Sequence, residues 1–517
     1  MNLQNGCSIG LSSFFLFLFL LAAAYDNALA QQEPVQIPRY EMLELRFQAQ
    51  VRVENPFTDY LLKVKLAAPD GHTRVIDGFF AGDGNGGQAG NIWKARISPD
   101  QPGVWSWQLV AGDVEDPSLI GQNGSFECID TGLSGGIRAQ GRFFQLQNGT
   151  PVFLQGNFLD FSNGLISTHV LMSEQVSDDM RQRILKRQLE QGVNKINVYL
   201  ANKGDYKKIK VWPWLDDDLM RMDLRRWADF DRYIRMLKSV DLFTELWFFA
   251  DDSGFGKLEQ REKNQLFRYA MARTSAFSHT LYIIALEWQE GWSLESVRQS
   301  GNYIQQRNPW GRLLSVHNLP SKKADSMRSF FSGVYRSLFG SMKYSNEPWA
   351  DFIASQAGNG ANPQDVNSLA IELAKKEQIP HLSEEFGILK KDQNLRLMRN
   401  MWANLLGGAA GGGTGSNIAA LMHFFELTGL PFQRLQPANH LCRNGGKEVF
   451  CAAEPERYYL VYSMGVDIEL DIKGDQYRGY WYDPLTAGSL RPISQEDQEV
   501  FRLPDKSKDW VLWLSKQ

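Results

Sequence analysis

The spacing of hydrophobic and polar residues predicts three successive kinds of structure along the chain. Residues 43–53 (LELRFQAQVRV) alternate apolar and polar positions, which is the period of a strand buried on one face. Turn residues separate further short apolar runs at 61–66, 73–80, 92–97 and 104–110. Short strands with regular turns are typical of a β-sandwich, which we expect over residues 36–132.

From residue 133 the pattern alternates between strands and amphipathic helices. A hairpin is expected around Asn148-Gly149, and Ser177 and Asp223 are expected to cap helices. We expect the strands at 153–157, 195–200, 242–250, 282–286, 312–316, 351–355, 381–383 and 419–424. Eight strand–helix steps over residues 133–430 predict a (β/α)8 TIM barrel in an α/β chain. Strand signals alone return over 431–517 and predict a C-terminal β-sandwich.

Two glycine-rich segments need separate interpretation. The first, 82–87 (GDGNGG), lacks the spacing of a calcium-binding loop and the Lys-Ser/Thr of a phosphate loop. We interpret it as a turn. The second, 407–415, also lacks the phosphate-loop signature and follows a helix, so close backbone packing is expected there.

The net charge and the N-terminal segment indicate which partners and which cellular location to expect. The net charge of −4 over 517 residues gives no basic stripe, so no nucleic-acid partner is expected. The apolar run 11–24, followed by Ala28-Leu29-Ala30, predicts a signal peptide over residues 1–30, cleaved after Ala30. Because the run is shorter than a membrane span, the mature chain is expected to be secreted or periplasmic and free of the membrane. An uncleaved anchor is the alternative, since no Lys or Arg precedes the run.

The four cysteines predict at most one disulfide. Cys7 falls in the signal segment, and Cys128 is expected to be a buried thiol. Cys442 and Cys451 flank a loop with an Asn-Gly-Gly turn, so a hairpin disulfide between them is expected in an oxidising compartment. The spacing of Cys and His indicates no metal site, and no cofactor is expected.

Two carboxylate motifs carry the candidate chemistry. The apolar run 282–286 leads into Gln289-Glu290, and the short strand 381–383 ends in Glu384-Glu385. The carboxyl ends of barrel strands form one rim, where two carboxyl groups can act as acid and nucleophile on a glycosidic bond. We therefore predict Glu290 and Glu385 as the catalytic pair. On strand parity Glu287 faces opposite to Glu290; Glu287 and Glu384 remain the alternatives.

Both motifs resemble a known family. The segment 283–292 (IIALEWQEGW) resembles the fourth-strand segment of the large clan of retaining glycoside hydrolases, in which a strand ends in Asn-Glu and the Glu is the acid/base. Gln289 stands where the clan has the Asn that commonly bonds the sugar 2-hydroxyl. The segment 379–387 (IPHLSEEFG) resembles the seventh-strand segment, which implies that Glu385 is the nucleophile.

The order of domains resembles that of the secreted apiosidase-like hydrolases. These carry an N-terminal sandwich with a GVW-type strand, matched at 103–105, and a barrel. Their C-terminal sandwich, once labelled collagen-binding, has a WYDP signature, matched at 481–484. The resemblance implies a plant or algal polysaccharide or oligosaccharide as substrate, and nothing in the sequence indicates the oligomeric state.

Polar and aromatic residues at other expected strand ends are candidate substrate contacts. They are Gln289, His317, Asn157, Asp160, Asn197, Tyr199, Trp247, Gln356 and His423. His317 could instead bond the nucleophile. Rival chemistries lack their motifs, since no GxSxG, HExxH or dinucleotide-binding GxGxxG is present in a fitting context. A secreted carbohydrate-binding protein with an inactive barrel is the alternative function.

Overall fold

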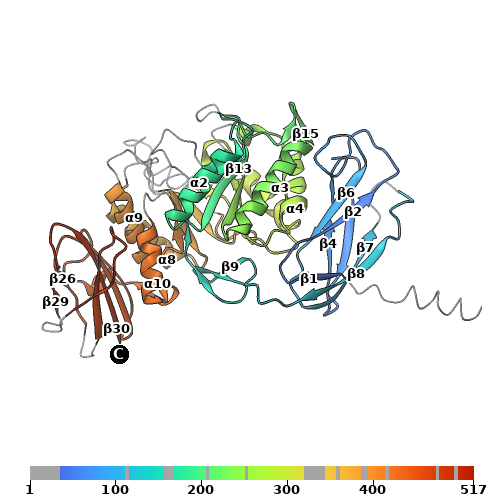
Figure 1. The fold of residues 1–517 in the computed structure, drawn as a ribbon. Coiled ribbons are helices and arrows are strands. Elements are labelled where there is room, and N and C mark those ends of the chain that lie inside the picture. Colours follow the sequence, from blue (N-terminus) through green and yellow to red (C-terminus); the bar gives the residue numbers. More distant parts are fainter. Residues whose placement is uncertain are drawn as a thin grey trace, which may run out of the picture.

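The computed structural model describes residues 35–110, 116–156, 168–204, 209–250, 254–318, 344–356, 361–385, 394–413, 418–472, 477–493 and 499–516, with only the backbone at Glu385 and Asn394. Structural statements below refer to these residues. The predicted signal peptide, Asn157 and Asp160 lie outside them. Figure 1 shows an elongated molecule, with β-rich parts at both ends and a mixed α/β part between them.

The N-terminal part contains two largely antiparallel sheets. One sheet has the order β1 (Gln36–Pro38), β8 (Asn123–Ile129), β7 (Gly103–Val110), β3 (Lys63–Ala67) and β4 (Thr73–Asp77), with only the β1–β8 pair parallel. The other has the order β2 (Leu43–Gln48), β6 (Ile92–Ile97) and β5 (Phe79–Phe80). The expected strands are present, but the first ends at Gln48 rather than Val53. Its ladder stops because the Asp116 carboxylate accepts the amides of Gln50 and Val51.

A small sheet leads into the central part. It joins β9 (Ile137–Gln140), β10 (Phe143–Leu146) and β11 (Pro151–Val152), and the β10–β11 pair forms the expected hairpin around Asn148-Gly149.

Parallel pairing links the strands of the central part in chain order. They are β12 (Leu154–Gln155), β13 (Lys195–Ala201), β16 (Phe243–Phe249), β17 (Thr280–Ala285), β18 (Leu314–Ser315) continued by β19 (His317–Asn318), β20 (Ile353–Gln356), β21 (His381–Glu385) and β22 (Gly411–Gly412). Gly156 bridges to Lys195, and β22 returns to pair with β12. β13 and β17 are buried at every residue, as parallel strands covered on both faces are.

Helices alternate with these strands (Figure 1). They are α2 (Asp178–Glu190), α3 (Leu224–Ser239), α4 (Gln260–Thr274), α5 (Leu294–Gln305), α8 (Pro363–Lys376), α9 (Asn394–Leu406) and α10 (Ala419–Thr428). The expected caps are confirmed, because the Ser177 side chain accepts the Met180 amide and Asp223 accepts the amides of Arg225 and Arg226. Before α3 lies the hairpin of β14 (Trp214–Leu215) and β15 (Asp218–Met222).

The predicted eighth strand at 419–424 is wrong, because this segment begins α10. Ala420, Leu421 and Phe424 are its buried residues, which is helical spacing, and Gly429 ends the helix in the left-handed conformation. The last parallel strand is the glycine pair of β22. An apolar run does not by itself distinguish a short strand from a buried helix, and two glycines carry no apolar pattern.

The C-terminal part packs on α9 and α10. Its six-stranded antiparallel sheet has the order β23 (Gln436–Pro437), β24 (Val449–Glu454), β25 (Tyr458–Met464), β30 (Asp509–Lys516), β27 (Tyr477–Tyr482) and β28 (Arg491–Pro492), and β26 (Ile468–Glu469) pairs with β29 (Val500–Phe501). Arg399 of α9 donates two hydrogen bonds to Asp509, at 2.7 and 2.8 Å, and the Trp402 ring stacks on Tyr462.

The predicted disulfide is absent. Cys442 and Cys451 are buried free thiols, as is Cys128. A hydrogen bond with Cys442, together with burial, raises the pKa of the Cys451 thiol well above its usual value, so the two side chains are in contact. Cys442 and Cys451 lie together as expected from their spacing, but their sulfur atoms are not bonded. Among the helices described, none has both the length and the apolar character needed to cross a membrane.

Candidate functional site

The candidate site lies where the central parallel strands end. Carboxyl ends of parallel strands meet at one edge of a sheet, and side chains from several strands converge there. β13, β16, β17, β20 and β21 end at residues 201, 249, 285, 356 and 385. The sequence candidates Tyr199, Trp247 and Gln356 lie on the last three residues of their strands.

Glu287 lies two residues beyond β17, in an unusual backbone conformation. Its φ is 43° and its ψ is 50°, a left-handed geometry that residues other than glycine adopt at a cost. Its amide donates to His317 Nδ1 at 3.4 Å, and its Oε1 accepts a short hydrogen bond from Gln356 Nε2. The left-handed turn therefore holds a half-buried carboxyl group against strands β19 and β20.

Glu290 lies one turn later, in the short 3-10 helix η4 (Trp288–Glu290). The indole of Trp288 and the amide of Gln289 both donate to Asn318 Oδ1, at 2.9 and 3.3 Å, which fixes the turn on β19. Glu290 itself is exposed, whereas Glu287 is partly buried. The two carboxylates that the sequence left as alternatives thus differ in depth.

Gln356 connects the two carboxylate motifs. Its side chain donates to Glu287, and its Cα is the register partner of Glu385 on the neighbouring strand β21. The register shifts between Ser355 and Gln356, so Glu384 is passed over and Glu385 lies opposite Gln356. Adjacent strands lie about 4.8 Å apart, so the backbone of Glu385 is one strand away from the residue that contacts Glu287.

Glu384 points into a buried polar cluster instead. Lys195 Nζ lies 2.6 Å from Glu384 Oε2, 2.9 Å from Glu245 Oε2 and 2.9 Å from Asn197 Oδ1, and Asn197 Nδ2 donates to Glu384 at 2.9 Å. All four residues are at most 2% exposed. Glu384 thus makes a buried salt bridge with Lys195. Asn197 lies in the interior of β13, not at its end.

The cluster holds two carboxyl groups but one lysine. Burial and the nearby Glu384 raise the pKa of Glu245 to about 8. Burial opposes the charge on Lys195, but Glu245 and Glu384 outweigh it and raise the pKa of this lysine. The raised pKa values favour a protonated Glu245 and a charged Lys195 at neutral pH.

A group of aromatic and histidine rings lies over this cluster. His169, in the 3-10 turn η1 (Thr168–Val170), stacks on Tyr199 with ring centroids 4.5 Å apart and meets the edge of Trp247 at 5.0 Å. The ring centroid of His317 lies 5.0 Å from that of Trp247, whose indole donates to Glu245 Oε2 at 2.9 Å. His169 is not recognisable from the sequence, because it stands in a segment with no strand or helix pattern.

His317 is a neutral donor at the edge of this group. Burial and the charge of Lys195 lower its pKa to about 3. Because Nδ1 accepts the Glu287 amide, the proton of the neutral ring is on Nε2. Among the described residues, Nε2 finds no hydrogen-bond partner. The ring therefore presents one unused N–H beside the Glu287 turn.

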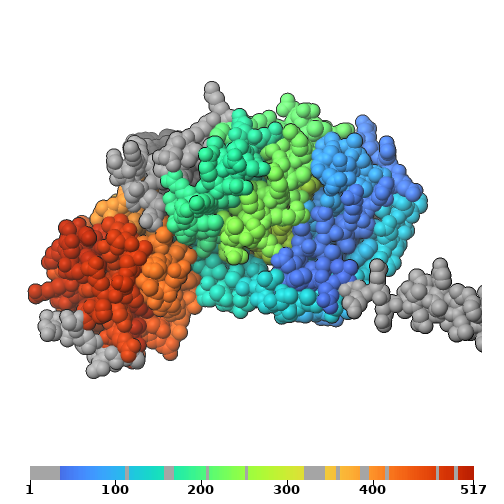
Figure 2. All heavy atoms as spheres, viewed as in Figure 1, coloured from blue at the N-terminus to red at the C-terminus, as the bar shows by residue number. Residues whose placement is uncertain are grey.

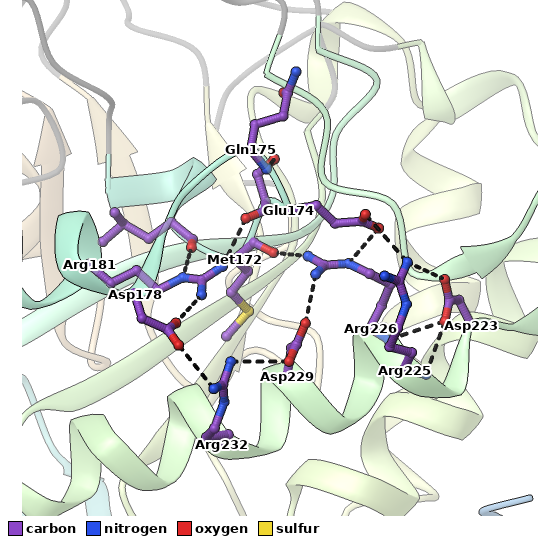
Figure 3. A network of polar contacts seen from close by, with 12 residues as sticks. Met172, Glu174, Gln175, Asp178, Arg181, Asp223, Arg225, Arg226, Asp229 and Arg232 are labelled. Carbon is purple, nitrogen blue, oxygen red and sulfur yellow. Dashed lines mark hydrogen bonds and ion pairs between the residues drawn. The ribbon is translucent and has the colours of Figure 1, made fainter. Parts of the chain in front are cut away.

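Arginines of α2 and α3 hold residues 171–174, which follow His169 in the chain (Figure 3). Arg181 donates to the carbonyls of Leu171 and Ser173, at 2.7 and 2.8 Å, and Arg226 donates to the carbonyl of Met172. Arg226 also pairs with Glu174 at 3.1 Å. Buried backbone carbonyls need such donors, so the network stabilises one path for residues 171–174.

His423 does not lie at a strand end. It lies on α10, partly exposed, with Nδ1 3.5 Å from Glu426 of the same helix. The prediction of a strand-end role for His423 is wrong because its segment is helical. Among the described residues, no cluster of three or more His, Cys, Asp or Glu has the arrangement of a metal site.

Comparisons with known proteins give the fold a context. A candidate glycoside hydrolase from Bacteroides vulgatus ATCC 8482 matches with a TM-score of 0.72 and 16% identity over 93% of this chain and 100% of its own. A glycoside hydrolase family 5 protein from the same organism matches with a TM-score of 0.56 and 14% identity, over 74% of this chain and 93% of its own. A further structure, named glycoside hydrolase, matches with a TM-score of 0.56 and 16% identity, over 74% of this chain and 97% of its own. The chain thus shares the fold of these proteins.

Sequence comparison adds little. Residues 36–112, in the N-terminal β part, match the model of a domain of unknown function, DUF5060. No curated protein matches the chain.

Proposed function

We propose that this protein is a glycoside hydrolase whose central strands close into a (β/α)8 barrel. The parallel pairings that return from β22 to β12 support the barrel. The fold shared with glycoside hydrolases supports the reaction class. The observation that carries the proposal is Gln356, which bonds Glu287 and lies opposite Glu385, and so brings both carboxylate motifs to one strand end.

In this proposal the nucleophile is Glu385 and the acid/base comes from the 287–290 turn. Resemblance favours Glu290 for the second role. Position favours Glu287, which is partly buried and bonded to Gln356, whereas Glu290 is exposed. We therefore assign the acid/base to Glu287, with Glu290 as the alternative, and Glu384 is assigned to the buried cluster.

The reaction would proceed by double displacement with retention. The carboxylate of Glu385 attacks the anomeric carbon while the acid protonates the departing glycosidic oxygen. The acid/base residue, now ionised, then takes a proton from a water molecule, and this water attacks the anomeric carbon and releases the sugar from Glu385. His317 Nε2–H is a donor available to the nucleophile or to a sugar hydroxyl.

The remaining candidates keep their proposed roles around the sugar. Tyr199 and Trp247 supply aromatic surface, and Gln356 and Gln289 supply amides near the acid/base turn. Asn157 and Asp160 are proposed contacts from the end of the first strand. The substrate is proposed to be a plant or algal polysaccharide or oligosaccharide that the exported protein meets outside the cytoplasm.

A panel of algal and pectic polysaccharides tests the proposal, with the product anomer followed by NMR. We expect Glu287→Gln and Glu385→Gln to abolish hydrolysis with unchanged thermal unfolding, and Glu290→Gln to keep most of it. Loss in Glu290→Gln with activity in Glu287→Gln would move the acid/base to Glu290. Binding of a glycan without turnover by the wild-type protein would favour a carbohydrate-binding protein with an inactive barrel.

A further inference from the structure

A pocket of about 190 Å³ lies outside the candidate site, between the β2–β6 sheet of the N-terminal part and helices α3 and α4. Figure 2 shows the N-terminal part, in blue, packed directly against the green central part. The charged residues of its lining are Glu44, Lys94, Arg96, Asp231, Arg235 and Arg273. Four cations and two carboxylates give the pocket an excess of positive charge.

The two carboxylates are already neutralised by three of these cations. Asp231 receives two bonds from Arg96, at 2.9 and 2.5 Å, and lies 3.0 Å from Arg273. Glu44 lies 2.8 Å from Lys94 and from Arg96. Burial would raise the pKa of Asp231, but Arg273 and Arg96 hold it below its usual range, so this group stays ionised and paired. Neither carboxylate is therefore paired with the fourth cation of the lining.

Arg235 is that fourth cation. Its guanidinium lies 5.6 Å from the centre of the Phe277 ring, and among the described residues it has no ion pair or hydrogen bond. The residue is exposed, so it is placed at the open side of the pocket. By contrast, Arg232 on the same helix pairs with Asp178 and Asp229 at 3.0 and 3.1 Å.

The glycine-rich turn 82–87 forms another wall. Asp83 accepts the amides of Asn85 and Gly87, at 2.7 and 2.9 Å, which folds the turn. Gly84 and Gly86 have positive φ and line the pocket, and a Cβ on Gly86 would lie 3.2 Å from the side chain of Ala228 on α3. The close approach explains why this turn is rich in glycine, and it leaves backbone rather than side chains at the pocket wall.

We propose that this pocket binds a small oxyanion, held chiefly by Arg235 with Lys94 and Arg273 close by. A sulfate, phosphate or carboxylate group matches the fork of donors that a guanidinium presents. The volume suffices for a group the size of several water molecules, each of about 30 Å³ in the liquid. The anion can be a free ion or the acidic group of a saccharide. The site is separate from the candidate active site and does not depend on the proposed hydrolase activity.

Binding of sulfate and phosphate to the full chain tests the proposal, by calorimetry and by thermal unfolding against sodium chloride of equal ionic strength. Sulfate stabilises many proteins without a site, so the comparison of variants decides. We expect Arg235→Gln to weaken sulfate binding at least about tenfold, as expected for loss of one charged donor. Arg232→Gln should bind sulfate as the wild type does.

Two further probes distinguish the sources of the anion. Glucuronate and a glucose sulfate ester carry the acidic group on a sugar, whereas inorganic sulfate and phosphate are free ions. Binding of the sugar-borne groups with the same dependence on Arg235 assigns the pocket to acidic saccharides, and binding of the inorganic ions alone assigns it to free anions. Equal responses of wild type and Arg235→Gln to all four probes would overturn the proposal.

Discussion

Single residues show how the interior beneath the candidate site is charge-balanced. Lys195 contacts Glu245 and Glu384, and the lysine and Glu384 are 0% and 1% exposed at their side chains. Ion pairs this deep are costly to break from one side, because the remaining charge stays buried without a partner. The cluster therefore links β13, β16 and β21 directly below the strand ends.

Replacing Lys195 tests this link. Lys195→Met should lower the free energy of unfolding by about 3–5 kcal/mol, because it leaves Glu384 buried without its cation. Urea denaturation followed by tryptophan fluorescence measures the change. Lys186→Met, which removes an exposed lysine 3.9 Å from Glu190, is the matched control and should unfold as the wild type does. Equal free energies of unfolding for the two variants would show that the buried ion pair does not stabilise the fold.

The raised pKa of Glu245 predicts a pH dependence. In the folded state this group holds its proton up to about pH 8, whereas in the unfolded chain it loses the proton near its ordinary value. Between those limits the folded state binds more protons, so its contribution to stability is full at low pH and is lost as the pH rises through 8. Unfolding free energies from pH 5 to 9 should fall less steeply for Glu245→Gln than for the wild type. Parallel profiles would contradict this assignment.

At the residue scale, the sequence indicates the two carboxylate motifs but not how deeply each of their glutamates is buried. The sequence leaves Glu384 and Glu385 as alternatives, and only the structure shows that Glu384 contacts the buried Lys195, at 2.6 Å. The contacts of Lys195 and His169 join segments far apart in the chain, so no local pattern signals them.

Strands and helices with a clear period were predictable, and those without one were not. The caps at Ser177 and Asp223 and the buried strands β13, β16 and β17 follow from local pattern. The contiguous apolar residues of 419–424 predict a strand where the structure has a helix, and β22 is too short and its residues too small to show a pattern. The expected close packing of the glycine run is confirmed, since a Cβ on Gly411 would lie 2.3 Å from the Leu154 carbonyl oxygen.

Strand β22 gives a test at the scale of elements. Gly411→Ala should destabilise the protein by several kcal/mol, because its methyl group would collide with the β12 backbone and with Leu382. Gly488→Ala, where the nearest atom is 3.5 Å away, should leave the unfolding midpoint unchanged. Thermal unfolding compares the two variants. A midpoint for Gly411→Ala equal to that of the wild type would mean that β12 and β22 are not closely paired.

Over the whole molecule, the N-terminal part is joined to the central part by buried charges. Arg96 of β6 bonds Asp231 of α3 and the Arg273 carbonyl of α4, at 2.6 Å for the latter. The domain limits at 36–132, 133–430 and 431–517 remain predictions. The network nevertheless implies that the first two parts unfold together, because their separation would expose or unpair these groups.

Asp231 tests this coupling. Asp231→Ala should lower the free energy of unfolding by about 3–5 kcal/mol and split the transition in two, because Arg96 and Arg273 lose their shared carboxylate at the contact. Calorimetry of the full chain records both effects. Asp218→Ala, an exposed partner of Arg221 at 3.3 Å, is the control and should keep the wild-type transition. A wild-type transition in Asp231→Ala would mean that the two parts are held together by other contacts.

The central claim is that two strand-end carboxylates act on one glycosidic bond, and azide rescue tests it most directly. With an activated glycoside of an accepted sugar, Glu385→Ala should regain turnover in azide and yield the glycosyl azide of inverted configuration, whereas Glu287→Ala should yield the retained one. Glu384→Ala and Glu290→Ala should show no dependence on azide. Rescue with inversion in Glu384→Ala, or in none of the four variants, would contradict the account.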